Sequence, residues 1–231
     1  MLIKFGGGVL DARGSIGGNT FARNRYGNYA RSRTKPVNPN SSRQQQMRAI
    51  LGGLVEYWRS TLTVEQRAAW NQYGANVNWL NKLGESVKLA GFNHFTRSNS
   101  VRLLAGLGVL ADGPTELTLP AADETANATI SAGTGNLSVS FDDSLEWVDE
   151  DGGALLVSVS IPQGEGRVFL QPQFRYAGVV LGDATTPPTS PASIACPWEI
   201  AAGQQCLVQF RILRADGRVS MPFFRTVTIG S

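Results

Sequence analysis

The sequence has few of the residue types that usually carry catalysis or bind metals. Its 231 residues include one histidine, His94, and two cysteines, Cys196 and Cys206. A Ser-His-Asp triad would have to use His94, and no nucleophile elbow is present. A zinc site needs three or four Cys or His ligands, which this spacing does not offer. We therefore expect no enzyme activity, no catalytic residues, no metal and no cofactor, and we expect His94 to pack in a helix or cap it.

Two motifs resemble ligand sites but lack the residues that those sites need. The glycine-rich stretch GGGVLDARGSIGG has no Lys-Ser/Thr pair, so we interpret its glycines as conformational and not as a phosphate loop. The acidic stretch DDSLEWVDEDGG lacks the ligand ladder of an EF-hand, which favours a solvated turn between strands. The two cysteines are expected to be reduced thiols, and a bridge between them is an open alternative.

Long hydrophobic runs are also missing. The longest apolar run, residues 103–111, has nine residues, two of which are glycines, whereas a membrane span needs about 20. The apolar stretch at the N-terminus is too short for a signal peptide. These absences predict a soluble protein that is made, and either used or assembled, in a cytoplasm.

The two halves of the sequence carry opposite charge. Residues 1–115 hold 15 Lys and Arg and 5 Asp and Glu, a net charge of +10. Residues 116–231 hold 6 Arg, no Lys and 13 Asp and Glu, a net charge of −7. An asymmetry of this size indicates modules with different surroundings.

Residues 1–40 combine seven basic residues with one acid, and their large apolar residues are scattered. Such a segment buries too little to offset a backbone entropy of about 1–2 kcal/mol per residue. Basic residues that alternate with aromatic rings suit an extended assembly arm that becomes ordered on a partner. The rings would be buried against that partner, and the arginines would form bidentate hydrogen bonds to its carboxylate or phosphate groups. A disordered tail is the alternative. The predicted partner-binding residues are Arg13, Phe21, Arg23, Arg25, Tyr26, Tyr29, Arg31, Arg33 and Lys35.

Residues 41–112 are predicted to form a helical docking domain. Asn40, Ser41 or Ser42 can cap a first helix, whose apolar face is marked by Met47, Ile50, Leu51, Leu54 and Trp58. The TVEQ sequence at 63–66 predicts a capping box. We expect a loop over 76–91 and a third helix over 92–104. The resulting core is thin for about 70 residues, so contact with another chain would stabilise it.

Residues 118–231 change to a period of two, which predicts strands. Cys206, Val208, Phe210 and Ile212 alternate with polar positions, and Leu137, Val139 and Phe141 do the same. Turn sequences such as DEDGG, PQGEG and RADGR separate the strands. The fold class is therefore predicted to be α+β, with an extended basic arm, a small helical bundle and a C-terminal antiparallel β-sandwich of immunoglobulin or fibronectin III style.

Three segments in order give a resemblance to a known group of proteins. GSIGGNTFARNRYGNYARSRTKPVNPNSSRQQQMR, WRSTLTVEQRAAWNQYG and GFNHFTRSN, within residues 13–103, resemble the N-terminal half of proteins that tailed bacteriophages and prophages encode among their virion structural genes. The C-terminal strands resemble the immunoglobulin-like modules that phages append to capsid and tail proteins. This resemblance implies a structural role in a virion and implies no catalytic residues.

Three functions are compatible with these patterns. The leading hypothesis is a virion structural protein, assembled in the bacterial host cytoplasm, that acts as a capsid decoration (cement) protein or as a connector or tail-associated subunit. Its partners would be other virion proteins (major capsid, portal or connector, or tail subunits) and further copies of itself, with no membrane. The alternatives are a nucleic-acid-binding packaging or regulatory protein that uses the arm, and a carbohydrate or host-surface binding module that uses Trp198.

Overall fold

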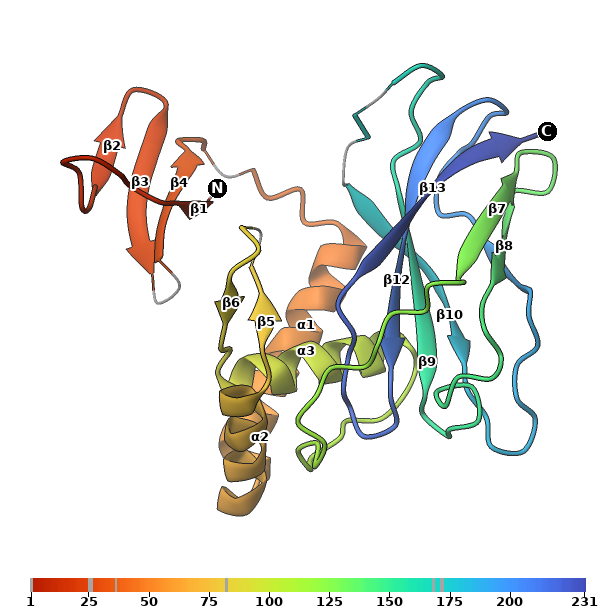
Figure 1. Cartoon of the computed structure of the whole chain (residues 1–231), viewed down its shortest axis with the longest axis horizontal. Coiled ribbons are helices and arrows are strands. Elements are labelled where there is room, and N and C mark those ends of the chain that lie inside the picture. The colour runs from red at the N-terminus through yellow and green to blue at the C-terminus, as the bar shows by residue number, and fades with distance from the viewer. Residues whose placement is uncertain (1, 25–26, 36, 82, 168, 171–172) are drawn as a thin grey trace.

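Helices and strands are segregated along this chain, which makes it an α+β protein (Figure 1). The structure, a computed structural model, describes residues 2–24, 27–35, 37–81, 83–167, 169–170 and 173–231. A small N-terminal sheet comes first, then a helical region with a two-stranded hairpin, and then a large sheet. None of the helices described is long and apolar enough to cross a membrane.

Four strands within residues 2–24 and 27–32 form a small antiparallel sheet. Its strands pair in the order β1-β4-β3-β2 and have the bounds β1 (Leu2–Ile3), β2 (Gly14–Ile16), β3 (Asn19–Asn24) and β4 (Gly27–Ser32). This differs from the extended arm that the sequence predicts. The physical reason is local: Gly17 and Gly18 make a two-residue connection between β2 and β3, and Gly17 adopts a φ of 57°, which glycine takes without strain.

The helical region follows the predicted caps. Its elements are α1 (Ser42–Glu56), the π-helical turn η1 (Tyr57–Thr61), α2 (Val64–Asn76) and α3 (Gly91–Leu104). Ser41 Oγ accepts from the amide of Gln44 at the start of α1. The predicted capping box is confirmed, because Thr63 Oγ1 accepts from the Gln66 amide at 3.2 Å and Gln66 Oε1 accepts from the Thr63 amide at 3.0 Å.

Two expectations for the helical region need correction. In α1 only Leu54 is buried, and Leu51 on the predicted apolar face is 45% exposed, because α3 covers only part of that helix. The stretch 76–91, expected to be a loop, contains a short hairpin of β5 (Trp79–Leu80) and β6 (Ser86–Val87). The core of the region is small and consists of Leu54, Leu62, Trp70, Tyr73, Val77 and Phe95.

The C-terminal strands form one large sheet that bends back toward itself. Its order is β10-β9-β12-β13-β7-β8-β11, with the bounds β7 (Asn127–Ser131), β8 (Asn136–Ser140), β9 (Ala154–Ser160), β10 (Phe174–Leu181), β11 (Ala192–Ala195), β12 (Gln205–Leu213) and β13 (Phe223–Gly230). The end strands β10 and β11 come close enough to make the sheet nearly barrel-like. The predicted alternation in β12 is confirmed, since Cys206, Val208, Phe210 and Ile212 are buried.

The sheet is mixed, so the prediction of a purely antiparallel C-terminal region is wrong. β13 pairs with β7 in parallel through Ile229 and Ile130, whereas the other pairs in this sheet are antiparallel. The last strand of the sheet pairs with a strand about 100 residues earlier in the chain. Alternation within one strand does not specify which other strand it pairs with or in which direction. We call residues 118–231 the β-domain.

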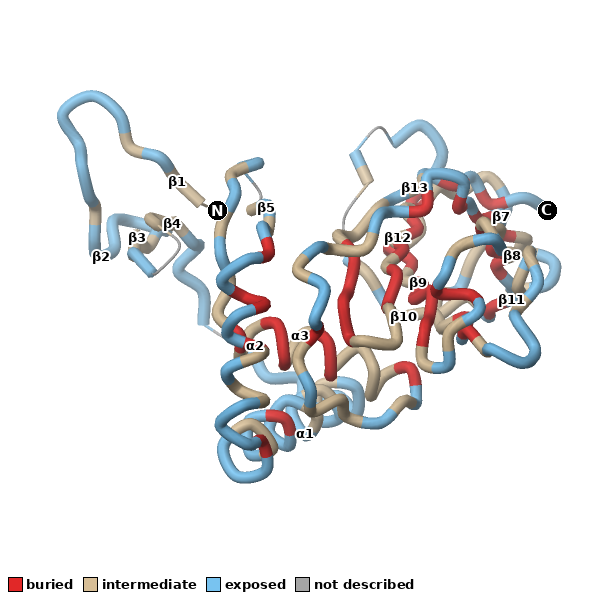
Figure 2. Tube along the Cα trace, turned by 60° about the horizontal axis from the view of Figure 1, so that its bottom comes forward, coloured by how far each residue is buried: buried red, intermediate tan, exposed pale blue. Residues whose placement is uncertain are grey.

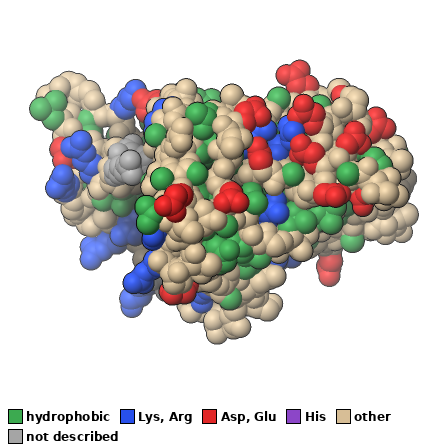
Figure 3. Space-filling model, turned by 90° about the horizontal axis from the view of Figure 1, so that it is seen from below, with side chains coloured by type: hydrophobic (Ala, Val, Ile, Leu, Met, Phe, Trp, Pro, Cys, Tyr) green, Lys and Arg blue, Asp and Glu red, His purple; other side chains and the backbone are tan. Residues whose placement is uncertain are grey.

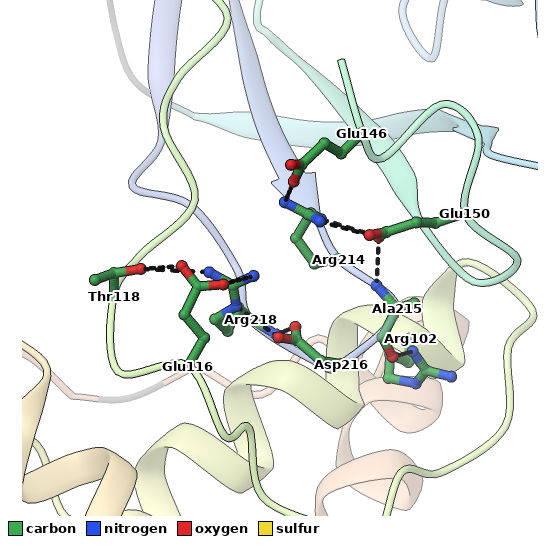
Figure 4. Close-up of polar contacts among 9 residues, drawn as sticks. All are labelled: Arg102, Glu116, Thr118, Glu146, Glu150, Arg214, Ala215, Asp216 and Arg218. Atoms are coloured by element: carbon green, nitrogen blue, oxygen red, sulfur yellow. Dashed lines mark hydrogen bonds and ion pairs between the residues drawn. The ribbon is translucent and has the colours of Figure 1, made fainter.

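Two arginines of α3 fasten the helices to the β-domain, and a buried arginine of the β-domain holds the connection between them. From α3, Arg97 donates to the carbonyl of Ser220 at 3.0 Å, and Arg102 donates to the carbonyl of Ala215 at 3.3 Å. Arg218, with a side chain only 5% exposed, pairs with Glu116 at 2.7 Å and with Asp216 at 2.6 Å (Figure 4). The contacts of Arg97 and Arg102, with the apolar packing of Val101 and Leu107 against the sheet, join the helices and β-domain into one unit, and Arg218 ties the connection after α3 to the β-domain.

Candidate docking interface

The N-terminal sheet has no core of its own. None of its described residues, and none of residues 33–40 apart from position 36, which is not described, is buried. By contrast, β9 buries six of its seven residues. Isolated small sheets need a packed apolar face or a helix against them to be stable in water. In Figures 1 and 2 the sheet stands apart from the helices and the β-domain, beside the β5–β6 hairpin. It is therefore an exposed element for which the described part of the chain supplies no buried face.

The strand register places one ring and one guanidinium on each face of this sheet. Phe21 lies opposite Ala30 and Arg23 opposite Asn28, so Phe21 and Arg23 share one face. Tyr29 lies opposite Ala22 and Arg31 opposite Thr20, so Tyr29 and Arg31 share the other. The two rings are half-buried and the two arginines exposed. Each face thus offers an apolar anchor next to a cation.

The remaining predicted arm residues are scattered around the sheet. Arg13 lies beside Asp11, with 3.2 Å between Nε and Oδ2. Arg33 donates its backbone amide to the carbonyl of Gly18 at 2.8 Å, while its side chain is exposed. Lys35 is exposed in the connection to α1. Arg25 and Tyr26 lie outside the described residues. The structure therefore brings together four of the predicted residues, as two pairs on opposite faces.

Exposed apolar side chains of the same segment were not among the residues predicted from the sequence. Val9, Leu10, Ile16 and Val37 are 50%, 89%, 77% and 86% exposed. Ile16 is in β2, which ends the sheet and leaves one edge unpaired among the described strands. These residues could have been predicted from the sequence, because branched apolar side chains in a segment too polar to form a core favour burial against a partner.

One ion pair ties the sheet to the hairpin. Lys4 Nζ contacts Glu85, and this hydrogen bond holds the pKa of Glu85 below its usual range. A hollow of about 340 Å³ lies between the two elements, and its lining includes Phe5, Val9, Leu10, Asn81, Leu83 and Glu85. Because Lys4 is 75% exposed, this pair restrains the sheet weakly.

The other candidate sites are structural in character. His94 is buried with its ring 4.9 Å from that of Tyr73; burial, followed by the charge of Arg97, lowers its pKa to about 4. Its ring thus packs in α3, as expected. Trp198 donates Nε1 to the carbonyl of Val159, and Arg175 lies over its ring at 3.7 Å. That guanidinium covers one face of the ring.

The acidic loop and the cysteines are likewise part of the framework. Residues 142–153 do not form a merely solvated turn, because Trp147 and Val148 within them are each 1% exposed. Cys196 and Cys206 are free thiols, and burial raises the pKa of Cys206 to about 12. Among the residues the structure describes, no group of three or more His, Cys, Asp or Glu side chains is arranged to hold a metal.

Neither a protein-family model, nor a curated protein, nor a solved structure matches this chain. The function is therefore inferred from the geometry of the chain itself, and above all from its N-terminal sheet.

Proposed function

We propose that this chain is a non-enzymatic structural subunit of a tailed-phage virion, which docks on neighbouring subunits through its N-terminal sheet. In the particle it would act as a capsid decoration protein or as a connector or tail-associated subunit. The helical region and the β-domain form the rigid body of the subunit, and the N-terminal sheet reaches to a neighbour.

A single observation carries this proposal: four paired strands with no buried residue precede a unit that has a large core. A segment of this kind gains little from folding alone and covers a large surface when it orders on a partner. The aromatic and arginine residues of the ring–arginine pairs described above are the types enriched at interface centres, and the exposed apolar side chains add surface that a partner could cover.

We further propose that the β-domain is an immunoglobulin-like or fibronectin III-like module. In support, β7 and β8 face β9 and β12 across one core, with Ile130 and Val139 on one side and Val157 and Phe210 on the other. Two layers of short strands around one core are the architecture of a β-sandwich. In the particle this module would be displayed outward, where its acidity favours solubility.

Limited trypsin digestion tests the docking role. In the free protein we expect early cleavage after exposed Arg23, Arg31 and Arg33, because no buried residue protects this segment. In purified particles the same bonds should be protected. Arg97, which is half-buried in α3 and bonded to the carbonyl of Ser220, serves as the internal control and should resist cleavage in both states. Equal sensitivity of the N-terminal sites in free protein and particles would contradict the proposal.

Nucleic acid is the second candidate partner, because each face of the sheet carries a ring beside an exposed arginine. That function predicts binding to nonspecific DNA that weakens steeply between about 50 and 200 mM salt. Absence of a gel shift at low salt would exclude it.

A further inference from the structure

We propose that the partner of the N-terminal sheet is the acidic β-domain of a second copy of this chain, so that copies associate head to tail. This inference rests on the proposed docking function and names the occupant of the sheet. The docking site is the exposed sheet, and the argument for its occupant is charge complementarity within a single sequence.

The charges are separated along the long axis of the molecule. The sheet and the β-domain lie at opposite ends, with the helices between them (Figure 1). Figure 3 shows Lys and Arg gathered over the end that carries the N-terminal sheet and the helices, and Asp and Glu gathered over the β-domain. The first 115 residues carry a net charge of +10 and the rest −7. Each molecule therefore carries both halves of a complementary pair, placed too far apart to meet within one copy.

The acidic end is presented on a rigid loop. Trp147 and Val148 anchor residues 142–153 in the core, and the backbone amide of Asp183 donates to the Val148 carbonyl at 3.0 Å. Glu146 and Glu150 both point toward Arg214 (Figure 4), and Glu150 also accepts from the amide of Ala215 at 3.1 Å. A loop fixed in this way loses little conformational entropy on binding.

Three carboxylates of the loop are not neutralised within the part of the chain that the structure describes. Arg214 forms ion pairs with Glu146 and Glu150. The carboxylates that are exposed and have no ion pair among the described residues are Asp143, Asp149 and Asp151. On the sheet, Arg23 and Arg31 are equally exposed and likewise have no ion pair among the described residues. Exposed arginines at one end of the molecule and exposed carboxylates at the other, without ion pairs among the described residues, could pair across the polar rim of an interface.

The charges argue against pairing of two sheets with one another. An isologous dimer through β2 would bring two segments together that each contain seven basic residues and one acid. Like charges across an interface cost affinity, while opposite charges steer association and fix orientation. In a heterologous contact, the N-terminal sheet of one copy binds the β-domain of the next copy, and every copy makes the same two contacts. Such contacts close into rings or extend as filaments, which are the assemblies that a particle subunit needs.

Sedimentation velocity of the full-length protein over a concentration series, at 50 and 500 mM NaCl, tests this inference with four charge variants. The first reverses the sheet (Arg23→Glu with Arg31→Glu), the second reverses the loop (Asp143→Arg with Asp149→Arg), and the third combines all four changes. The fourth, Arg59→Glu with Arg67→Glu, makes the same charge change on the helices as a matched control. Far-UV circular dichroism establishes that each variant is folded.

We expect wild-type protein to self-associate at 50 mM NaCl and to dissociate at 500 mM. Each two-residue reversal should raise the dissociation constant by at least about tenfold. The four-residue variant should associate as tightly as wild type. An equimolar mixture of the sheet-reversed and loop-reversed proteins should also associate, because each sheet then meets an opposite charge. The helix control should stay within about twofold of wild type.

Three results would overturn the inference. One is a wild-type protein that stays monomeric in 50 mM NaCl across the series; if its sheet is nevertheless protected in particles, docking stands and the occupant is another protein. Another is self-association whose dissociation constant changes neither with the NaCl concentration nor with reversal of the charges on the sheet. The third is a monomer whose sheet binds a DNA duplex in an Arg23- and Arg31-dependent way, which would assign the sheet to nucleic acid.

Discussion

Arg214 shows how a single side chain holds a loop of the β-domain in place. It bonds Glu150 through two nitrogens and also contacts Glu146, and these bonds lower the pKa of Glu150. The two carboxylates differ in environment, because the side chain of Glu150 is 28% exposed and that of Glu146 is 76% exposed. Burial therefore makes Glu150 the structural partner and leaves Glu146 a surface charge.

Replacing Glu150→Gln should lower the free energy of unfolding by about 1–2 kcal/mol, since a charged hydrogen-bond pair and an acceptor for the Ala215 amide are weakened together. Glu146→Gln should cost less than about 0.5 kcal/mol. Urea denaturation of both variants measures the difference. Equal losses would show that the pair at Glu150 is not what fixes this loop.

His94 predicts a pH dependence of stability. Burial and the charge of Arg97 lower its pKa in the folded state to about 4, from an ordinary value of 6.5. Between these two values the unfolded chain binds a proton that the folded chain does not bind. The stability that neutral His94 contributes is therefore complete above pH 6.5 and is lost as the pH falls toward 4.

Urea unfolding of wild type and of His94→Gln at pH 7 and pH 4.5 isolates this effect. The drop in the free energy of unfolding between the two pH values should be larger for wild type, because carboxylate titration is common to both proteins. An identical drop in both would mean that His94 is protonated in the folded state at pH 4.5.

At the scale of elements, the contact between α2 and α3 depends on two glycines. A Cβ at Gly74 would lie 2.6 Å from the carbonyl oxygen of Leu89, and one at Gly91 would lie 2.5 Å from the amide nitrogen of Asn71. Backbone atoms cannot move aside as a side chain does, so these glycines permit the close approach of the two helices. By contrast, a Cβ at Gly52 in α1 would meet nothing within 4 Å.

These geometries predict opposite effects for the same substitution. Gly74→Ala should destabilise the protein by about 1–3 kcal/mol because the helices must separate. Gly52→Ala should stabilise it by about 0.5–1 kcal/mol through helix propensity. Thermal unfolding of the two variants provides the measurement, and a shift of the same sign in both would contradict the packing described here.

Local patterns made some elements predictable. The capping box needs only Thr63 and Gln66, and β12 needs only its own alternation, so both could be read from neighbouring residues. The parallel pairing of β13 with β7 depends on residues about 100 positions apart and left no local signal. The β2–β3 hairpin had a readable Gly17–Gly18 turn, but its strands lack an apolar face, which is why composition favoured an arm without strands.

For the candidate interface, the sequence identified the segment but not its surface. Phe21, Arg23, Tyr29 and Arg31 were predicted from residue type, whereas their division between two faces required the register of β3 and β4. Ile16 and Leu10 escaped notice because an isolated apolar residue in a polar segment forms no periodic pattern. Contacts with a partner also leave no imprint on spacing within one chain.

At the scale of the whole molecule, the chain combines a well-packed unit with a poorly packed extension. Among its described residues the β-domain has a core of 18 buried residues, and the helices are joined to it by Arg97 and Arg102. The N-terminal sheet shares none of this burial. Local stability should therefore differ greatly between the two parts of the same chain. The account as a whole depends on this difference, and on its removal when a neighbour covers the sheet.

Hydrogen–deuterium exchange of the full-length protein, free at high salt and then assembled, measures this difference most directly. In the free protein we predict that amides of residues 14–24 and 27–32 exchange within seconds while those of β9 and β12 stay protected for hours, and that assembly slows the first group by at least about a hundredfold. Slow exchange of residues 14–24 and 27–32 in the free monomer, comparable with that of β9, would contradict the account.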